Sequence, residues 1–247
     1  MRDSVESFGG FSLYKPQPDL CGDADRKNSK LQDGHHLLND VRFVLRGKYM
    51  EKDWLRLAAD AYYRMTTMEY HIILGRRGKQ YLLDIEFPPE TFYHLAGLHK
   101  LKQNYPLFQN SSTRILKSIR LGHIGIDMIR GDQNFHRIKK RLVALSELEE
   151  ILDKADTNFY EFNSRKMWIP TKITADYVAK GIGESDAVTF SFFVKDNKKY
   201  CMNSLFLEQK IDYTERQTQY TVLLKEKRIN EGSGQRIIEL YRHKTFV

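Results

Sequence analysis

The segment over residues 91–101 carries the side chains best suited to proton transfer and phosphate binding. It reads TFYHLAGLHKL and contains His94, His99 and Lys100. Imidazole exchanges a proton near neutral pH, and an ammonium group can stabilise the charge of a phosphorane. On a continuous helix His94 lies within a turn of Leu98, while the other two polar side chains point elsewhere. Two interpretations stay open: His94 is a hydrogen-bonded core residue, the commoner case, or a catalytic residue in a cleft with Lys100 at its rim.

Further polar side chains occur at alternating positions in the C-terminal third of the chain. Ser204 lies on one apparent strand and Thr221 and Lys225 share one face of another, while Tyr213 lies in the connection between them. Such residues form either the solvent side of a sheet or the floor of a site. Cleavage of RNA without a metal needs a base for the 2′-OH, an acid for the 5′-oxygen and a cation for the phosphate. These residue types can supply all three.

The positive charge of the chain is concentrated in one region. The 40 basic and 32 acidic residues give a net charge of +8, and residues 31–146, with 19 basic and 11 acidic groups, account for all of it. This concentration favours a polyanionic partner, nucleic acid before a membrane surface. A solvated helix face is the alternative. The candidate contacts to a phosphate backbone are Arg114, Lys117, Arg120, Arg137 and Lys140.

The composition is typical of a folded cytoplasmic protein. With 247 residues, 41% of them hydrophobic, the chain is long enough to bury a core. Its two cysteines, Cys21 and Cys201, exclude a disulfide framework and a paired-thiolate zinc site. No apolar stretch approaches the roughly 20 residues of a membrane span, and no signal peptide or GxxxxGK[ST], GxGxxG, HExxH or GxSxG motif is present. We therefore expect no membrane association, no metal and no cofactor.

Hydrophobic periodicity predicts the elements that position these residues. Helices are predicted over residues 54–65, 91–103, 112–120 and 134–155. A β-hairpin is predicted from strands at 69–73 and 81–87 around a turn at 75–79. After Asn158 the period changes from 3.6 to 2, which predicts strands at 168–178, 188–194, 200–207, 219–226 and 236–241.

This order of elements predicts an α+β fold. Helices would pack on an antiparallel sheet of about four to five strands, with an additional β-hairpin and a basic helical insertion. Residues 1–30, which contain scattered glycine and proline, are predicted to form an irregular N-terminal arm. Residues 31–247 are predicted to form a single domain, mainly helical with a hairpin over 31–157 and mainly β over 158–247.

Several segments together resemble a phage-associated family of the barnase, EndoU, colicin and RelE-like superfamily, whose members are predicted nucleases of mobile elements. The similarity covers roughly Leu31 to Arg242, and the HLAGLHKL helix is its best anchor. The segments are FYHLAGLHKL, the hairpin YHIILGRRGKQYLLDIEF, ITADYVAKG, and the closing strands YCMNSLFLEQKIDY and QYTVLLKEKRI.

The resemblance implies a nuclease fold, a helix with a four-stranded antiparallel sheet, that cuts RNA and commonly uses no metal. It puts His94 and Lys100 in the family's helix motif. The residues that it puts in the strand motifs are Ser204, Tyr213, Thr221 and Lys225. The basic helices over 111–155 depart from a minimal toxin nuclease of this type, and members of the superfamily use different sets of residues.

We therefore hypothesise a metal-independent endoribonuclease of phage or toxin type, which forms a 2′,3′-cyclic phosphate by attack of the 2′-OH. His94 would be the general base or acid, and Lys100 and Lys225 would stabilise the phosphate. Tyr213 would be a second proton donor or a positioning residue. RNA is the expected substrate, and a neutralising or host protein is a further expected partner. The alternative is a non-catalytic module that binds nucleic acid or a partner protein on a nuclease-like fold.

Overall fold

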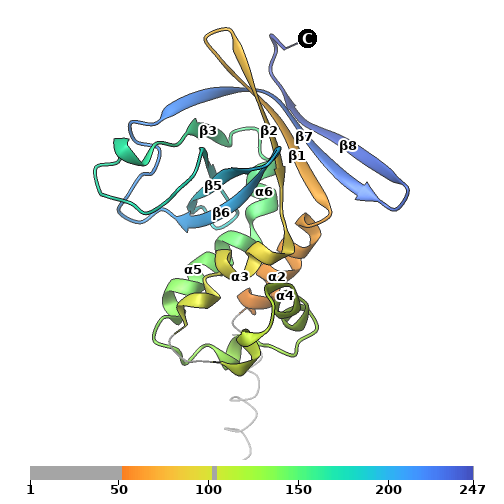
Figure 1. Ribbon diagram of the computed structural model, residues 1–247, viewed down its shortest axis with the longest axis vertical. Helices are drawn as coiled ribbons and strands as arrows, with labels where there is room; N and C mark the ends of the chain where they lie inside the picture. Colours follow the sequence, from red (N-terminus) through yellow and green to blue (C-terminus); the bar gives the residue numbers. More distant parts are fainter. Residues whose placement is uncertain (1–51, 102–104, 247) are drawn as a thin grey trace, which may run out of the picture. The chain divides into compact units, whose positions relative to one another are not determined.

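The structure, a computed structural model, describes residues 52–101 and 105–246 (Figure 1). The chain divides into two units, Met1–Glu51 and Lys52–Val247, and all described residues belong to the second. The predicted arm over 1–30 and the first part of the predicted domain, 31–51, lie outside the described residues.

Eight strands form one sheet that closes on itself. The strand order is β1-β2-β6-β5-β4-β3-β7-β8, and β1 also pairs with β7, so seven strands form a ring and β8 extends from β7. Among the described strands, only β2 and β6 pair in parallel, through Ile85 with Tyr200 and Glu86 with Cys201. The strands are β1 (Met68–Arg76), β2 (Lys79–Glu86), β3 (Asn158–Glu161), β4 (Tyr177–Ile182), β5 (Val188–Asp196), β6 (Lys199–Leu207), β7 (Thr218–Glu231) and β8 (Gly234–Arg242).

This closed, mixed barrel shows that the predicted fold, helices packed on an antiparallel sheet of four to five strands, was wrong. The β1–β2 hairpin is no addition to the sheet, because β1 pairs with β7 and β2 pairs with β6. These pairings join distant segments, such as Met68 with Ile229. Alternation within a strand shows which face is buried, but it does not identify the neighbouring strand. The ring closure was therefore not visible in the periodicity.

Five α-helices are described, and none is long and apolar enough to cross a membrane. Figure 1 shows α2 to α5 gathered at one end of the strands. The helices are α2 (Trp54–Met65), α3 (Phe92–Leu95), α4 (Ser112–Arg120), α5 (Phe135–Ser146) and α6 (Leu148–Asp153). Short 3-10 turns are η1 (Pro89–Thr91), η2 (Leu98–Lys100), η3 (Pro106–Gln109), η4 (Ile126–Met128) and η5 (Ser164–Lys166).

The local predictions were more successful than the fold. The structure confirms the helices at 54–65 and 112–120, the hairpin, and the strands that became β5 to β8. The predicted helix at 134–155 is divided into α5 and α6 at Glu147, whose φ of −103° departs from helical geometry. The predicted strand at 168–178 was wrong for most of its length, because β4 begins only at Tyr177, and β3 was missed.

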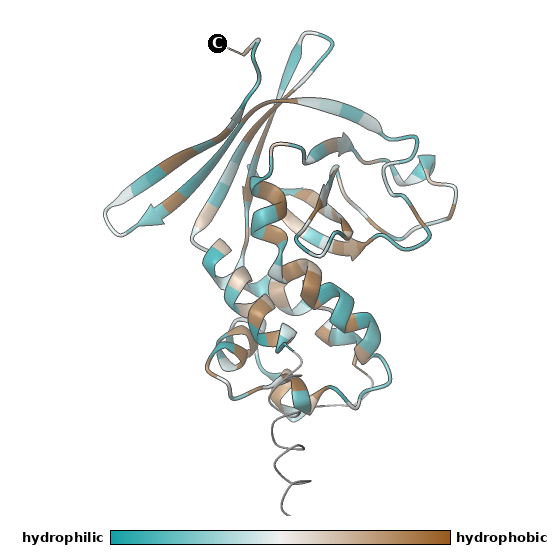
Figure 2. Cartoon of the chain, turned by 180° about the vertical axis from the view of Figure 1, so that it is seen from behind, coloured by the Kyte–Doolittle hydropathy of each residue, from teal (hydrophilic) through white to brown (hydrophobic). Residues whose placement is uncertain are grey.

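One large apolar core joins the helices to the barrel. Helix α2 starts where the Asp53 carboxylate accepts a hydrogen bond from the Arg56 backbone N–H at 3.0 Å. Its buried face contributes Leu55, Tyr62 and Met65, each fully buried, and such a side chain adds about 1.5–3 kcal/mol to stability. Figure 2 shows hydrophobic residues where the helices face one another. This core fixes α5 and the segment after β2, which carry the site described next.

Candidate active site

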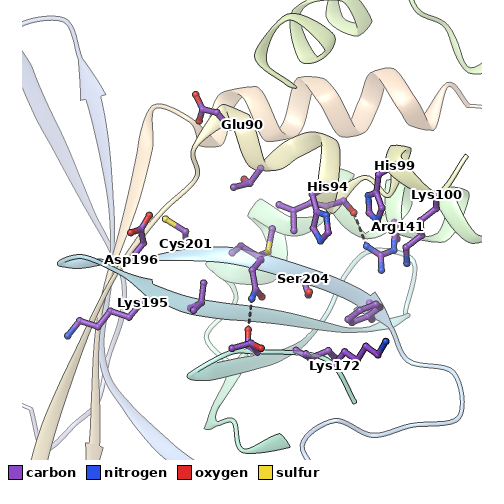
Figure 3. Close-up of a pocket in the computed structure, with 18 residues that line it drawn as sticks. Glu90, His94, His99, Lys100, Arg141, Lys172, Lys195, Asp196, Cys201 and Ser204 are labelled. Atoms are coloured by element: carbon purple, nitrogen blue, oxygen red, sulfur yellow. Dashed lines mark hydrogen bonds between the residues drawn. The ribbon is translucent and has the colours of Figure 1, made fainter. Parts of the chain in front are cut away.

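A cavity of about 830 Å³ lies between the α3–η2 segment, helix α5 and strands β5 and β6 (Figure 3). This volume is typical of a ligand-binding pocket. Leu95, Met202 and Phe206 contribute to its apolar wall. In Figure 3 the acidic side chains Glu90 and Asp196 lie at one end of the cavity, with Lys195 beside Asp196, while His94, His99, Lys100 and Arg141 gather at the other, basic end. The basic side chains that line it are His94, His99, Lys100, Arg141, Lys172 and Lys195.

A chain reversal at Gly97 brings His99 beside His94. Gly97 adopts a left-handed conformation with φ of +75°, so α3 ends at Leu95 and the predicted continuous helix over 91–103 was wrong. The two imidazole rings stack with centroids 4.4 Å apart and planes 6° from parallel. On an unbroken helix, residues five apart lie on different sides. His94 is exposed and lines the cavity, so it is not enclosed in the core.

The surroundings of the two imidazoles favour their neutral forms. Partial desolvation in the wall of the cavity, and then the charges of Arg141 and Lys100, lower the pKa of His94 below its usual 6.5. Burial, His94 and the same two cations lower the pKa of His99 to about 4. Both rings are therefore neutral at pH 7 in the free protein. A neutral imidazole can accept a proton, so this end of the cavity contains a base that is ready to act.

Arg141 is a buried cation that faces the cavity. Its side chain is 8% exposed, Nη1 donates to the Leu95 carbonyl at 3.4 Å, and the guanidinium lies 4.7 Å from the Phe206 ring centroid. Within the described residues it forms no ion pair with a carboxylate. Burial of a cation without a counter-ion costs free energy, and a guanidinium matches the geometry of phosphate oxygens. Arg141 therefore provides a natural position for a phosphate group.

Gly97 also makes room for Arg141. A Cβ atom at this position would lie 2.9 Å from the Arg141 Cδ, closer than real contacts allow. Lys100 adds a second cation at the same end, and burial, Arg141 and Arg137 lower its pKa. Asn134 Nδ2 donates to the Lys100 carbonyl at 2.7 Å and fixes the end of η2 on the start of α5. Gly97, the stacked histidine pair and the cations Arg141 and Lys100 thus form one connected arrangement.

The structure brings only some of the sequence-predicted site residues together. His94, Lys100 and Ser204 line the cavity. Tyr213 does not belong to the lining; it stacks on Phe206, with ring centroids 5.6 Å apart, and packs beside Phe190 and Phe192. Burial raises its pKa.

Lys225 and Thr221 lie away from this cavity. Lys225 is fully buried, and its Nζ donates to the carbonyls of Leu152 at 2.9 Å and Lys154 at 2.6 Å. Burial lowers its pKa to about 8. Thr221 lines a separate cavity of about 410 Å³. The two residues were predicted to share a strand face.

A β-bulge explains this separation. Ile73 pairs with Leu224 and Leu74 pairs with Val222, so Leu223 is an extra residue in β7. One extra residue reverses the alternation of the side chains that follow it. The bulge left no trace in the sequence pattern.

The basic residues predicted to contact a phosphate backbone differ in their environments. Arg114 and Lys117 are exposed on α4, and Arg137 and Lys140 are exposed on α5. Arg120 is already engaged, because its Nε donates to Asp60 at 3.2 Å and its guanidinium lies 3.4 Å from the centroid of the Tyr63 ring. Their contacts with nucleic acid stay predictions.

Two residues of the basic end were not predicted as site residues. His99 was assigned to another side of a helix that the structure does not contain. The signal was Gly97, which disfavours a helix interior. Arg141 was counted only as charge, although it lies in the apolar stripe formed by Ile138, Leu142 and Leu145. A cation within such a stripe indicates a buried charge.

Among the described residues, no group of three or more His, Cys, Asp or Glu side chains could hold a metal ion.

One comparison with known proteins, the scan against protein families, found a match. Searches of curated proteins and of solved structures found no significant match to the chain. The family model described as phage-Barnase-EndoU-ColicinE5/D-RelE like nuclease 4 matches residues 54–240, which include the whole lining of the cavity. The resemblance seen in the sequence is thereby confirmed, and the chain belongs to this family of phage-associated, nuclease-like proteins.

Proposed function

We propose that the protein is an endoribonuclease whose active site is the cavity beside His94. The observation that carries the proposal is the stacked His94–His99 pair next to Arg141, a buried cation with no carboxylate partner among the described residues. Membership of a nuclease-like family supports a nucleic-acid substrate, and the net charge of +8 supports a polyanion.

The first step is binding of a phosphodiester at the basic end of the cavity. Arg141 donates hydrogen bonds to the non-bridging oxygens, and Lys100 adds a second positive charge. The bound negative charge raises the pKa of His94, because it offsets the two cations that lower it in the free protein. The apolar wall formed by Leu95, Met202 and Phe206 contacts the rest of the nucleotide.

The chemical step is an in-line transfer of the phosphoryl group. His94 takes the proton of the 2′-OH, the 2′-oxygen forms a bond to phosphorus, and the bond from phosphorus to the 5′-oxygen breaks. Lys100, whose lowered pKa makes it a better proton donor, protonates the leaving 5′-oxygen. The products are a 2′,3′-cyclic phosphate and a 5′-hydroxyl.

The remaining residues position these groups. His99 stacks on His94 and restricts the orientation of its ring. Figure 3 shows His94, Lys100 and Arg141 at the same end of the cavity. The proposed reaction requires His94 and Lys100 to act on opposite sides of the phosphorus. The Ser204 hydroxyl on β6 provides a further hydrogen bond from the floor of the cavity.

Incubation of the protein with total tRNA and with mRNA, in the presence and absence of EDTA, tests this proposal. We expect cleavage that EDTA does not inhibit and that His94→Ala reduces by about 10²- to 10⁴-fold. If the wild-type protein cleaves RNA no faster than the His94→Ala control, the proposal is contradicted. Binding of RNA without cleavage would favour the non-catalytic alternative, and inhibition by EDTA would contradict a metal-independent reaction.

A further inference from the structure

The tip of the β1–β2 hairpin concentrates positive charge at the end of the strands opposite to the helices of the candidate active site (Figure 1). Arg76 and Lys79 form the last pair of the two strands, and Arg77 and Gly78 make the turn between them. Arg77 and Lys79 are exposed and Arg76 is half-buried. Within the described residues none of the three basic side chains forms an ion pair. The tip therefore presents three cations with no counter-ion.

Two features of this tip oppose its stability. Like charges directly across an antiparallel pair repel, as Arg76 and Lys79 do here. Arg77 has φ of +47°, a left-handed conformation that asparagine or glycine adopts at lower cost in this kind of turn. Local costs of this kind in one short segment are typical of functional positions. A bound anion would offset the repulsion.

The other walls of the tip supply hydrogen-bonding groups. A cavity of about 410 Å³ extends from the hairpin tip to Thr221 on β7 and to His243 and Thr245 in the C-terminal segment. Figure 1 shows the end of the chain running close to this tip. The backbone N–H of His243 donates to the Leu223 carbonyl at 2.8 Å, which holds this segment on β7. No carboxylate of the described residues contributes to the lining.

We propose that this cavity is a second phosphate-binding site, which holds the backbone of a nucleic acid at a phosphate other than the one that is cleaved. Arg77 and Lys79 supply the charge, and Thr221 supplies a hydroxyl donor. The Arg76 guanidinium lies over the Tyr220 ring, 5.8 Å from its centroid, and adds positive charge at the edge of the site. Guanidinium, ammonium and hydroxyl groups are the usual partners of backbone phosphates. This role also gives a function to Thr221, which lies outside the candidate active site.

The chemistry of the lining favours nucleic acid over a lipid headgroup. Of the described residues that line this cavity, Leu223 alone has a large apolar side chain. A segment that binds a membrane surface presents bulky apolar residues beside its basic ones. In Figure 1 the hairpin tip lies at the end of the strands opposite to α3 and α5, which carry the basic end of the first cavity. A nucleic acid that reaches both sites must be several nucleotides long.

The test is a binding measurement on the full chain carrying both Arg77→Asn and Lys79→Gln. The control chain carries Lys198→Gln and Lys210→Gln, which remove two exposed charges elsewhere. The probe is a fluorescent oligoribonucleotide with 2′-O-methyl groups throughout, which resists attack by the 2′-oxygen. We expect the tip variant to bind about tenfold more weakly than the control. The slope of the logarithm of the association constant against the logarithm of the salt concentration should become less steep by about 1.4, the value for two lost phosphate contacts to a single strand.

Because the probe cannot be cleaved, the result does not depend on the proposed reaction. The tip variant should also cleave a dinucleotide at the wild-type rate, since so short a substrate does not reach the tip. Equal affinity and equal salt slope in the tip and control variants would overturn the proposal. So would a tip variant that loses binding to vesicles of phosphatidylserine and phosphatidylcholine but keeps its affinity for the probe. The Arg77→Asn change should not impair folding, because asparagine accepts the left-handed conformation.

Discussion

The imidazole rings of His94 and His99 stack with their centroids 4.4 Å apart, although a straight helix would turn these residues to different sides. The left-handed Gly97 between them makes this contact, and the same glycine leaves space for the Arg141 side chain. A single backbone feature thus assembles the base and the phosphate-binding cation of the proposed site. Each of the following variants alters one part of this arrangement.

Gly97→Ala should reduce activity by more than its loss of stability can account for. The added methyl group would lie 2.9 Å from the Arg141 Cδ and would displace that side chain. We expect kcat/KM for RNA cleavage to fall by about 10- to 100-fold. Gly122→Ala is the matched control, because Gly122 has φ of +77° and no atom lies within 4 Å of the added Cβ.

Both variants should lose about 1 kcal/mol in the free energy of unfolding from backbone strain, as measured by urea denaturation. Only Gly97→Ala should lose activity as well. Equal activity in the two variants would show that the contact of Gly97 with Arg141 does not matter for the reaction.

Arg141→Met should separate function from stability. Arg141 is 8% exposed and its charge has no carboxylate partner among the described residues, so removal of the charge removes a desolvation cost. Loss of the hydrogen bond to the Leu95 carbonyl and of the contact with the Phe206 ring offsets this gain. We expect the free energy of unfolding to change by less than about 1 kcal/mol, while kcat/KM falls about 100-fold. Lys198→Gln, which removes an exposed cation outside the cavity lining, should alter neither quantity strongly. A large loss of stability with activity intact would assign Arg141 a purely structural role.

The pH dependence should follow the lowered pKa of His94. Burial, Arg141 and Lys100 disfavour the imidazolium, so His94 becomes neutral, and active as a base, at a pH below 6.5. The rising limb of kcat/KM against pH should therefore have its midpoint below 6.5. Lys100→Met removes one of the repelling charges and should move the His94 midpoint upward, which an NMR titration of the imidazole measures without any reaction. An unchanged or lower midpoint would contradict this electrostatic coupling.

Lys225→Met should affect stability rather than activity. The buried Lys225 ammonium donates to the carbonyls of Leu152 and Lys154 at the end of α6, and it lies outside the lining of the candidate active site. Loss of these bonds leaves two acceptors unsatisfied, which should lower the free energy of unfolding by about 1–3 kcal/mol. We expect kcat/KM to change less than about twofold, within the usual effect of distant substitutions. A large loss of activity at unchanged stability would instead support the phosphate-stabilising role predicted from the sequence.

Local structure was predictable where a repeating pattern reported it. The helix at Trp54–Met65 and the β1–β2 hairpin have clear periods, and their predicted bounds agree with the structure within a few residues. The closed barrel was not predictable, because it depends on pairings such as β1 with β7 and the short parallel contact of β2 with β6. These contacts depend on the positions of whole strands, and the pattern of one strand does not contain them.

The candidate site was predictable where the type of a residue, rather than the path of the backbone, identified it. His94 and Lys100 were identified by type and by the family resemblance, and both line the cavity. His99 was missed because a helix was continued through Gly97. The face shared by Thr221 and Lys225 was predicted from strict alternation, which the extra residue in β7 interrupts. Backbone irregularities thus account for the main differences.

The most direct test of the account is the identity of the cleavage products. A defined oligoribonucleotide, and the same oligonucleotide with a single 2′-deoxy substitution at the cleaved position, would be incubated with the protein in EDTA and analysed by mass spectrometry and ³¹P NMR. We predict a 2′,3′-cyclic phosphate and a 5′-hydroxyl from the first, no cleavage at the substituted position in the second, and about 10²- to 10⁴-fold less product with His94→Ala. Cleavage at the 2′-deoxy position, or wild-type product levels from His94→Ala, would contradict the proposed reaction.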